Sequence, residues 1–143
     1  MNFEQARTNM VLNQLRANRI KNSSLIEKIE LFPRENLYPK SYKHLAYSDK
    51  IIFLDDGRFI LPPLTSFHLL QALGEIDDES ILEIGSGFGT STSIINKFSS
   101  NIDCIESSMQ MTEVFKNSIK DGLFNASLLD LSLIHISEPT RRI

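Results

Sequence analysis

The chain contains 143 residues, of which 41% are hydrophobic and 23% are charged, a composition typical of one globular domain. No apolar run approaches the roughly 20 residues that a membrane-spanning helix needs, and the first residues lack the pattern of a signal peptide. Because Cys104 is the single cysteine, the sequence excludes an internal disulfide and a multi-cysteine metal site. We therefore expect a cytoplasmic protein that holds no metal ion and does not enter a membrane.

The net charge of −3 conceals an uneven distribution along the chain. Residues 1–50 carry nine lysines and arginines against five acidic residues, whereas residues 51–143 carry six against thirteen. The basic residues of the first part are dispersed, and a nucleic-acid-binding surface usually requires a cluster. We therefore expect no nucleic acid partner.

The first third of the sequence predicts two helices. Met10, Val11 and Leu15 recur at near-helical spacing, with polar residues between them. A second apolar helical face follows the polar stretch 22–24, which predicts a turn and an N-terminal cap. Pro33 ends this helix, because proline lacks the amide hydrogen and disfavours a helical residue before it.

Residues 51–61 predict a β-hairpin. Apolar stretches on either side flank an Asp-Asp-Gly-Arg sequence that is typical of a tight turn. Two prolines then end the second strand, and we expect Thr65 or Ser66 to cap the following helix, which ends near Gly74.

Residues 81–121 predict alternating strands and helices. Short apolar runs at 81–84 and 102–105 indicate strands, and the amphipathic stretches 90–98 and 109–119 indicate helices after them. A third strand would begin at 128–129. This order is that of βαβ units, so we expect an α/β fold with a parallel sheet.

The informative motif lies where the first of these strands turns into a helix. It reads E-x-G-x-G-x-G, with Glu83 two positions before Gly85 and further glycines at Gly87 and Gly89. Glycines permit unusual backbone angles and let a ligand approach the main chain, and the free amides at the helix start would face its negative group. Glu106 follows the next strand, where a carboxylate can accept hydrogen bonds from both hydroxyls of a ribose. The sequence therefore predicts a pocket for an adenosine-containing cofactor.

The spacing of the glycines distinguishes between cofactors. A dinucleotide-binding loop, G-x-G-x-x-G, would require a glycine where the chain has Thr90. With Glu83 ahead of it, the observed pattern resembles motif I of Rossmann-like methyltransferases that use S-adenosylmethionine. Two alternatives stay open: a tight turn that binds nothing, and a nicotinamide cofactor in an oxidoreductase.

A second set of motifs narrows the resemblance. The chain has N-M-V at residues 9–11, Q-L-R at 14–16, P-R-E-x-x-x-P at 33–39 and A-Y-S-D at 46–49. With these elements it resembles the protein-L-isoaspartate O-methyltransferase family over roughly residues 5–130. The resemblance implies a Rossmann-like three-layer sandwich, with a doubly wound, mostly parallel sheet and an N-terminal helical extension. It also implies methyl transfer from S-adenosyl-L-methionine to an isoaspartyl carboxylate of a protein or peptide, as in protein repair.

The same resemblance assigns cofactor-binding positions but no catalytic residue. The glycines would line the methionyl and ribose side of the cofactor, Glu83 would order the loop, Glu106 would hold the ribose, and Ser107 would lie near the adenine. The predicted cofactor-binding residues are Glu83, Gly85, Ser86, Gly87, Gly89, Glu106 and Ser107.

The chain differs from the family pattern at positions that would face the methyl acceptor. The family has T-[IV]-S-x-P before its first long helix, whereas this chain has Phe59 and Leu61 in place of the two hydroxyl residues. Leucine cannot donate a hydrogen bond to a carboxylate. A catalytically degenerate relative that still binds the cofactor is therefore an alternative. Thr65 and Ser66 could replace the hydroxyls, although we expect them at the helix cap.

The sequence also suggests that the chain is incomplete. Residues 131–143 resemble the translation of a sequencing adapter, and we expect them to be an artefact. We divide the chain into an N-terminal extension (1–74), the first half of the cofactor-binding domain (75–130) and this tail. If the other half of the sheet is missing, the first strand has an unpaired edge and exposed apolar surface.

Overall fold

The computed structural model describes residues 1–130 of the chain. The adapter-like interpretation of residues 131–143 lies outside the described residues. None of the helices within residues 1–130 is long and apolar enough to cross a membrane.

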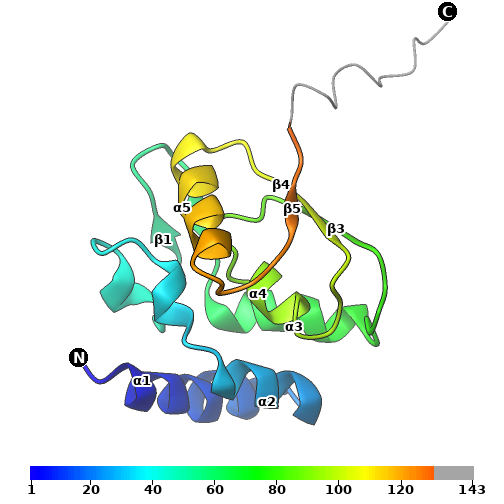
Figure 1. Cartoon of the computed structure of the whole chain (residues 1–143). Coiled ribbons are helices and arrows are strands. Elements are labelled where there is room, and N and C mark those ends of the chain that lie inside the picture. Colours follow the sequence, from blue (N-terminus) through cyan, green and yellow to red (C-terminus); the bar gives the residue numbers. More distant parts are fainter. Residues whose placement is uncertain (131–143) are drawn as a thin grey trace, which may run out of the picture.

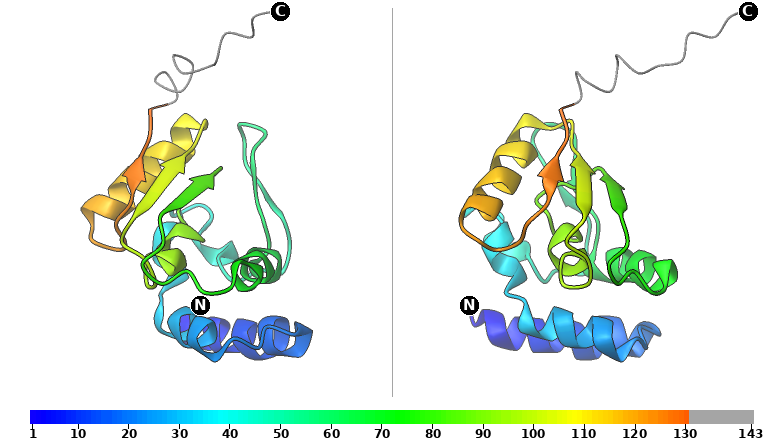
Figure 2. Two further views of the ribbon diagram at one scale, coloured as in Figure 1. Left: turned by 90° about the vertical axis from the view of Figure 1, so that its right-hand side faces the viewer. Right: turned by 45° about the vertical axis from the view of Figure 1, so that its right-hand side comes forward.

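The N-terminal part is helical, as the sequence predicts, and α1 and α2 lie together along one end of the molecule (Figures 1 and 2). The predicted cap is present, since the Asn22 side chain accepts a hydrogen bond from the Leu25 amide at 3.0 Å. The apolar residues Met10, Val11 and Leu15 are buried. The elements are α1 (Phe3–Asn9), the π-helical η1 (Met10–Leu15), the 3₁₀ turn η2 (Arg16–Asn18), α2 (Ser23–Leu31), and the 3₁₀ turns η3 (Arg34–Leu37) and η4 (Lys43–Leu45).

A buried polar network occupies the N-terminal motifs that carry the family resemblance. The Tyr47 hydroxyl donates to the Glu35 carboxylate and accepts a hydrogen bond from Arg7 Nε at 3.0 Å. Arg34, also buried, donates from its Nε to the Ala46 carbonyl at 2.7 Å. These contacts join α1 to the segments after α2. We call Arg7, Arg34, Glu35 and Tyr47 together the N-terminal clamp.

The predicted hairpin is confirmed. Strands β1 (Ile52–Phe53) and β2 (Phe59–Ile60) pair antiparallel, with Phe53 opposite Phe59. The Leu54 amide closes the turn on the Arg58 carbonyl at 2.8 Å, and Gly57 has a φ of +80°, a conformation that favours glycine. The hairpin projects from the helical part toward the start of α5 (Figure 2).

The helix after the hairpin begins earlier than predicted. Helix α3 (Pro63–Leu73) starts at a proline, whose fixed φ suits the first helical position, and ends at Gly74 as expected. Its N-cap is Pro62, so the prediction that Thr65 or Ser66 caps this helix is wrong. Ser66 instead lies one turn inside the helix and is buried.

The second part contains the predicted parallel sheet. Its strands have the order β3-β4-β5, and both pairs are parallel. The elements are β3 (Ile81–Ile84), α4 (Thr92–Ile95), β4 (Ile102–Ile105), α5 (Met109–Lys120) and β5 (Ser127–Leu128). Helix α4 is a single turn, shorter than the predicted 90–98, because its Thr-Ser-Thr-Ser run has low helix propensity.

Only one face of the sheet is covered within residues 1–130. The chain crosses from β3 to β4 and from β4 to β5 in the same direction along the sheet. Because such crossovers are right-handed, α4 and α5 lie on the same side of it (Figure 1). Ile102 and Cys104 point into the core on that side, whereas Leu82 and Ile84 are 55% and 76% exposed on the other. Strand β3 is an edge of the described sheet, as expected, and the second helical layer of a three-layer sandwich is not among the described residues.

Candidate functional site

The glycine-rich loop lies at the carboxyl end of β3, where ligands bind in open parallel sheets. Gly85, Gly87 and Gly89 have φ values of +79°, +58° and +88°. L-amino acids with a side chain rarely adopt these angles, so the alternating glycines create the turn. A Cβ would fit sterically at both Gly85 and Gly87, where it would contact Arg58 Nη2 and Met111 Sδ, respectively, at 3.8 Å.

The amides at the beginning of the loop are already engaged by the neighbouring strand. The Gly85 and Ser86 amides donate to the Ile105 carbonyl at 2.7 Å and 3.3 Å, and the Gly87 amide donates to Glu106 at 2.8 Å. These bonds join the loop to the end of the neighbouring strand. Because α4 is a single turn, its dipole is also short. The first half of the loop is thus fixed against the end of β4, and its amides at residues 85–87 are not available to an anion.

The side chain of Ser86 has an unusual environment. Ser86 is 4% exposed, and its hydroxyl has no hydrogen-bond partner among residues 1–130. A buried polar group without a partner costs free energy, so native proteins usually satisfy it. Ser86 lines the cavity beside the loop, where a bound molecule could supply the missing partner.

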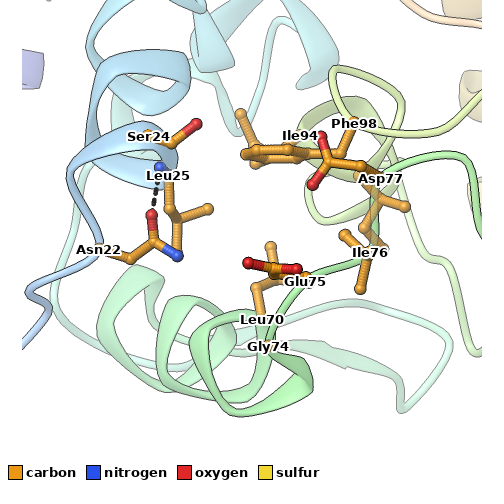
Figure 3. Close-up of a pocket in the computed structure, with 11 residues that line it drawn as sticks. Asn22, Ser24, Leu25, Leu70, Gly74, Glu75, Ile76, Asp77, Ile94 and Phe98 are labelled. Carbon is orange, nitrogen blue, oxygen red and sulfur yellow. Dashed lines mark hydrogen bonds between the residues drawn. The ribbon is translucent and has the colours of Figure 1, made fainter.

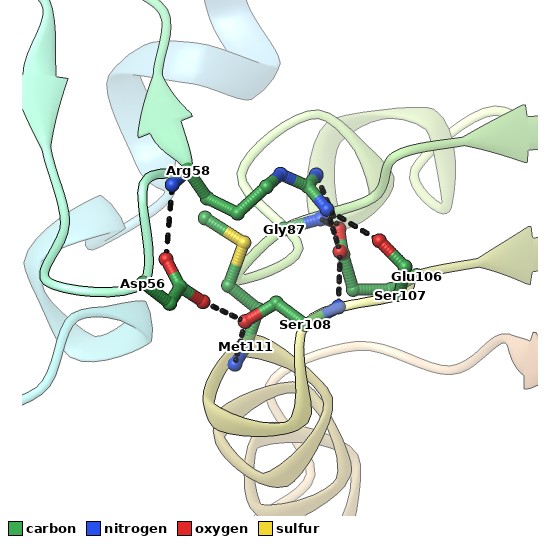
Figure 4. Close-up of polar contacts among 7 residues, drawn as sticks. All are labelled: Asp56, Arg58, Gly87, Glu106, Ser107, Ser108 and Met111. Carbon is green, nitrogen blue, oxygen red and sulfur yellow. Dashed lines mark hydrogen bonds and ion pairs between the residues drawn. The ribbon is translucent and has the colours of Figure 1, made fainter.

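The Glu106 carboxylate, at the end of β4, has all of its acceptor positions filled (Figure 4). One oxygen accepts from the Ser108 amide at 2.9 Å, and the other accepts from the Gly87 amide at 2.8 Å. Arg58 adds one hydrogen bond to each oxygen, at 2.5 Å and 3.1 Å, and its Nη1 also reaches Ser107 Oγ at 2.8 Å. The structure therefore brings the predicted Glu106 against the glycine loop and places Ser107 beside it.

Arg58 is a residue of this site that the sequence pattern does not reveal. Residues 55–58 form the turn that the sequence predicts, and this turn also reaches the end of β4 (Figure 4). The Asp56 carboxylate accepts from Ser108 Oγ at 2.5 Å, and this bond, with a second from the Arg58 amide, lowers the pKa of Asp56. No local sequence signal places a hairpin turn against a strand 48 residues later, so this contact requires the tertiary structure.

Glu83 faces the core side of the sheet below the loop. Its carboxylate accepts a hydrogen bond from Thr92 Oγ1 at 2.5 Å, and Cys104 Sγ lies 3.9 Å away. Burial raises the pKa of Glu83 to about 7, although the hydrogen bond from Thr92 opposes the shift. Glu83 thus ties β3 to α4 across the loop, a contact suited to the ordering role expected of it.

Two cavities open at this edge of the sheet. The smaller, of about 90 Å³, lies beside the glycine loop and is lined by Arg58, Phe59, Leu61 and Ser66 among others. The larger, of about 320 Å³, extends from Glu106 and Ser107 toward α5 and the end of β5. The predicted residues thus lie around adjacent cavities, except for Gly89, which lines neither.

A separate cavity of about 230 Å³ lies between α2, α3 and α4 (Figure 3). Leu25, Leu70 and Phe98 form apolar walls, and Glu75 and Asp77 stand at its side. None of the predicted cofactor-binding residues lines this cavity. It is therefore distinct from the candidate site.

A family model described as "Protein-L-isoaspartate(D-aspartate) O-methyltransferase (PCMT)" matches residues 6–131. The chain belongs to this family. The match includes both the N-terminal clamp and the glycine loop, so the resemblance seen in the sequence motifs is confirmed.

Individual relatives carry the same name. A protein-L-isoaspartate O-methyltransferase of Protochlamydia amoebophila is 27% identical over 116 residues, which are 81% of this chain and 55% of the relative. Protein-L-isoaspartate O-methyltransferase 2 of an Anaeromyxobacter species is 33% identical over 92 residues, 64% of this chain and 38% of the relative. The chain thus spans about half the length of such family members or less.

A solved structure with the name protein-L-isoaspartate O-methyltransferase superposes with a TM-score of 0.63 at 20% identity. The superposition covers 88% of this chain and 41% of the solved one. At this identity the likeness concerns the fold, and it confirms the α/β, Rossmann-like methyltransferase architecture.

Proposed function

We propose that this chain is part of an S-adenosylmethionine-dependent methyltransferase that acts on an isoaspartyl carboxylate of a protein or peptide. In this proposal residues 75–130 are the first half of the cofactor-binding domain, and residues 1–74 are an extension beside the substrate cleft. Membership of the protein-L-isoaspartate O-methyltransferase family supports the reaction class. A nicotinamide-dependent oxidoreductase is disfavoured by the same membership and by Thr90 in place of a third glycine.

The observation that carries the proposal is the contact between Glu106 and the glycine loop. Glu106 is held 2.8 Å from the Gly87 amide, at the strand end where a ribose-binding acid is found in Rossmann-type folds. The unpaired Ser86 hydroxyl, which lines the cavity beside the loop, fits a polar ligand that lies across the loop. These residues therefore suit an adenosine-containing cofactor with an amino-acid end.

The proposed chemistry requires positioning more than acid–base catalysis. The bound cofactor supplies a methyl group already activated by its sulfonium centre. A carboxylate acceptor is ionised near neutral pH, so the chain need not provide a strong base. The loop and Glu106 orient the donor, and the hairpin and α3 line the neighbouring cavity in which the acceptor would lie.

Ser66 offers a hydroxyl that could contact the acceptor. Phe59 and Leu61, which replace the hydroxyl residues of the family, line the smaller cavity, and the buried Ser66 lines it as well. Its hydroxyl is not needed at the helix cap, because Pro62 occupies that position. We propose that Ser66 donates a hydrogen bond to the acceptor carboxylate.

A catalytically degenerate, cofactor-binding relative is the second candidate, and the apolar Phe59 and Leu61 favour it. Transfer of labelled methyl from S-adenosylmethionine to an isoaspartyl peptide distinguishes the two when it is measured with the whole protein of which this chain is part. The matching aspartyl peptide is the control. The proposal predicts labelling of the isoaspartyl peptide alone, and at least about tenfold slower labelling by Ser66→Ala. Cofactor binding without labelling of either peptide would establish the degenerate alternative.

A further inference from the structure

We propose that Arg58 is a built-in competitor for the ribose-binding carboxylate, which a ligand must displace from Glu106 before its own ribose can bind. This inference rests on the proposed function, because it concerns the same adenosine-binding site. It assigns to the β1–β2 hairpin a direct role in the affinity of that site.

The hydrogen-bond count at Glu106 is the first argument. A carboxylate offers about four acceptor positions, and here two backbone amides and two guanidinium N–H groups fill them. The Gly87 and Ser108 amides are fixed by the main chain. Only the two bonds from Arg58 come from a long side chain, which is 34% exposed. A ligand hydroxyl can therefore reach Glu106 only if Arg58 withdraws.

The geometry of the ion pair is the second argument. Arg58 donates one N–H to each carboxylate oxygen, a two-pronged arrangement on a planar acceptor. A vicinal diol also offers two neighbouring O–H donors. The guanidinium thus occupies the positions that the two ribose hydroxyls would take, and the exchange of one for the other leaves no acceptor of Glu106 unpaired.

The position of the ion pair between the cavities is the third argument. Arg58 lines the smaller cavity beside the glycine loop, whereas Glu106 lines the larger one toward α5. The Arg58 Nη2 atom also lies 3.8 Å from where a Cβ would stand on Gly85. The guanidinium therefore lies across the place where a ligand would pass from one cavity to the other, and its withdrawal joins them.

The hairpin can release Arg58 without detaching from the start of α5. Asp56, in the same turn, is held separately by Ser108 Oγ at 2.5 Å. The Phe53 and Phe59 rings, 6.4 Å apart, stabilise the strands of the hairpin independently of Arg58. Displacement therefore needs a change in the Arg58 side chain, while the turn stays anchored through Asp56.

The first experiment compares Arg58→Met with the unmodified chain in the binding of adenosine. Adenosine is neutral, so the lost charge has little direct effect on it. If the paired state dominates in the free protein, its removal raises adenosine affinity about five- to tenfold. The control ligand 2′,3′-dideoxyadenosine lacks the two hydroxyls and should gain less than about twofold. Arg16→Met, which removes an exposed arginine paired with Glu30, should leave both affinities unchanged.

The second experiment uses the unmodified chain and therefore does not depend on the folding of a variant. Nitrogen NMR of the arginine side chains should show restricted rotation of the Arg58 guanidinium in the free protein. Saturating S-adenosylhomocysteine should restore free rotation, because the ligand replaces Arg58 at Glu106.

The outcomes separate this inference from the proposed function. Equal adenosine affinity in the Arg58→Met variant and the unmodified chain, or continued restriction of the guanidinium with ligand bound, would overturn the competitor role while the cofactor site stands. Failure of both proteins to bind S-adenosylhomocysteine would overturn the proposed function itself.

Discussion

The ring of Phe124 lies only 2.5 Å from the point where a Cβ would stand on Gly89. The third glycine of the loop therefore serves packing: Phe124 stacks edge-on against Phe115 of α5, with ring centroids 5.0 Å apart, and the loop fits against this pair. Gly85 and Gly87 have no such neighbour, so the three glycines have two different roles.

We predict that Gly89→Ala destabilises the fold by about 2–4 kcal/mol, because it adds a clash with a ring to an unfavourable positive φ. Gly57→Ala is the matched control, since its φ is +80° but no atom lies within 4 Å of the added Cβ. It should cost about 1 kcal/mol. Denaturant unfolding of both variants measures the difference, and equal losses would refute the packing role.

Ser86→Ala should separate stability from binding. Removal of a buried hydroxyl without a partner should leave the stability unchanged or raise it by about 1 kcal/mol. The same change should weaken S-adenosylhomocysteine binding about five- to tenfold, because the ligand loses its partner. Thermal unfolding and calorimetric titration test the two effects, with the exposed Ser100→Ala as control. A destabilised variant with unchanged affinity would show that Ser86 has a structural role alone.

Tyr47→Phe should destabilise the N-terminal clamp by about 1–3 kcal/mol. The substitution removes the hydroxyl that donates to the buried Glu35 carboxylate and accepts from Arg7. In the unmodified protein this hydroxyl remains protonated over the ordinary pH range, because burial and the bond to Glu35 raise the pKa of Tyr47 to about 12. Tyr42→Phe, in the partly exposed segment before η4, should cost less than about 0.5 kcal/mol in the same unfolding assay.

Glu83 should make the stability of the protein depend on pH. Its pKa is about 7 in the folded chain against an ordinary value of 4.5, so between these values the folded state holds a proton that the unfolded state releases. The contribution to stability is therefore complete below about pH 4.5 and falls as the pH rises through 7.

The stability of the Glu83→Gln variant should not show this decrease with rising pH. We expect the stability difference between the unmodified chain and the variant to change by about 1–2 kcal/mol from pH 5 to pH 8, after allowance for partial exposure. Urea unfolding across this range measures it. Parallel curves for the two proteins would show that Glu83 does not titrate as described.

Local patterns predicted the elements of this fold well, and the errors have physical causes. Asn22 capped its helix as expected because an Asx cap depends on three neighbouring residues. The helix after the hairpin began earlier than expected because Pro63 suits the first turn better than the hydroxyl residues suit a cap. Helix α4 was overestimated because apolar spacing hides the low helix propensity of its Thr-Ser run.

The candidate site was predicted in part. Gly87 and Glu106 could be placed together from the sequence, since consecutive parallel strands end at the same edge of the sheet. The pairing of Arg58 with Glu106 could not, because it depends on how the hairpin folds over the sheet. The engagement of the Gly85 amide by the Ile105 carbonyl also depends on that three-dimensional arrangement.

The most direct test of the cofactor site is calorimetric titration of S-adenosylhomocysteine into the unmodified chain and the Glu106→Gln variant, with NAD as the competing ligand class. We predict that the chain binds S-adenosylhomocysteine in preference to NAD. Glu106→Gln should weaken this binding on the order of 100-fold, whereas Glu113→Gln, at an exposed position of α5, should not change it. A preference for NAD, or the same S-adenosylhomocysteine affinity in a folded Glu106→Gln variant, would contradict this prediction.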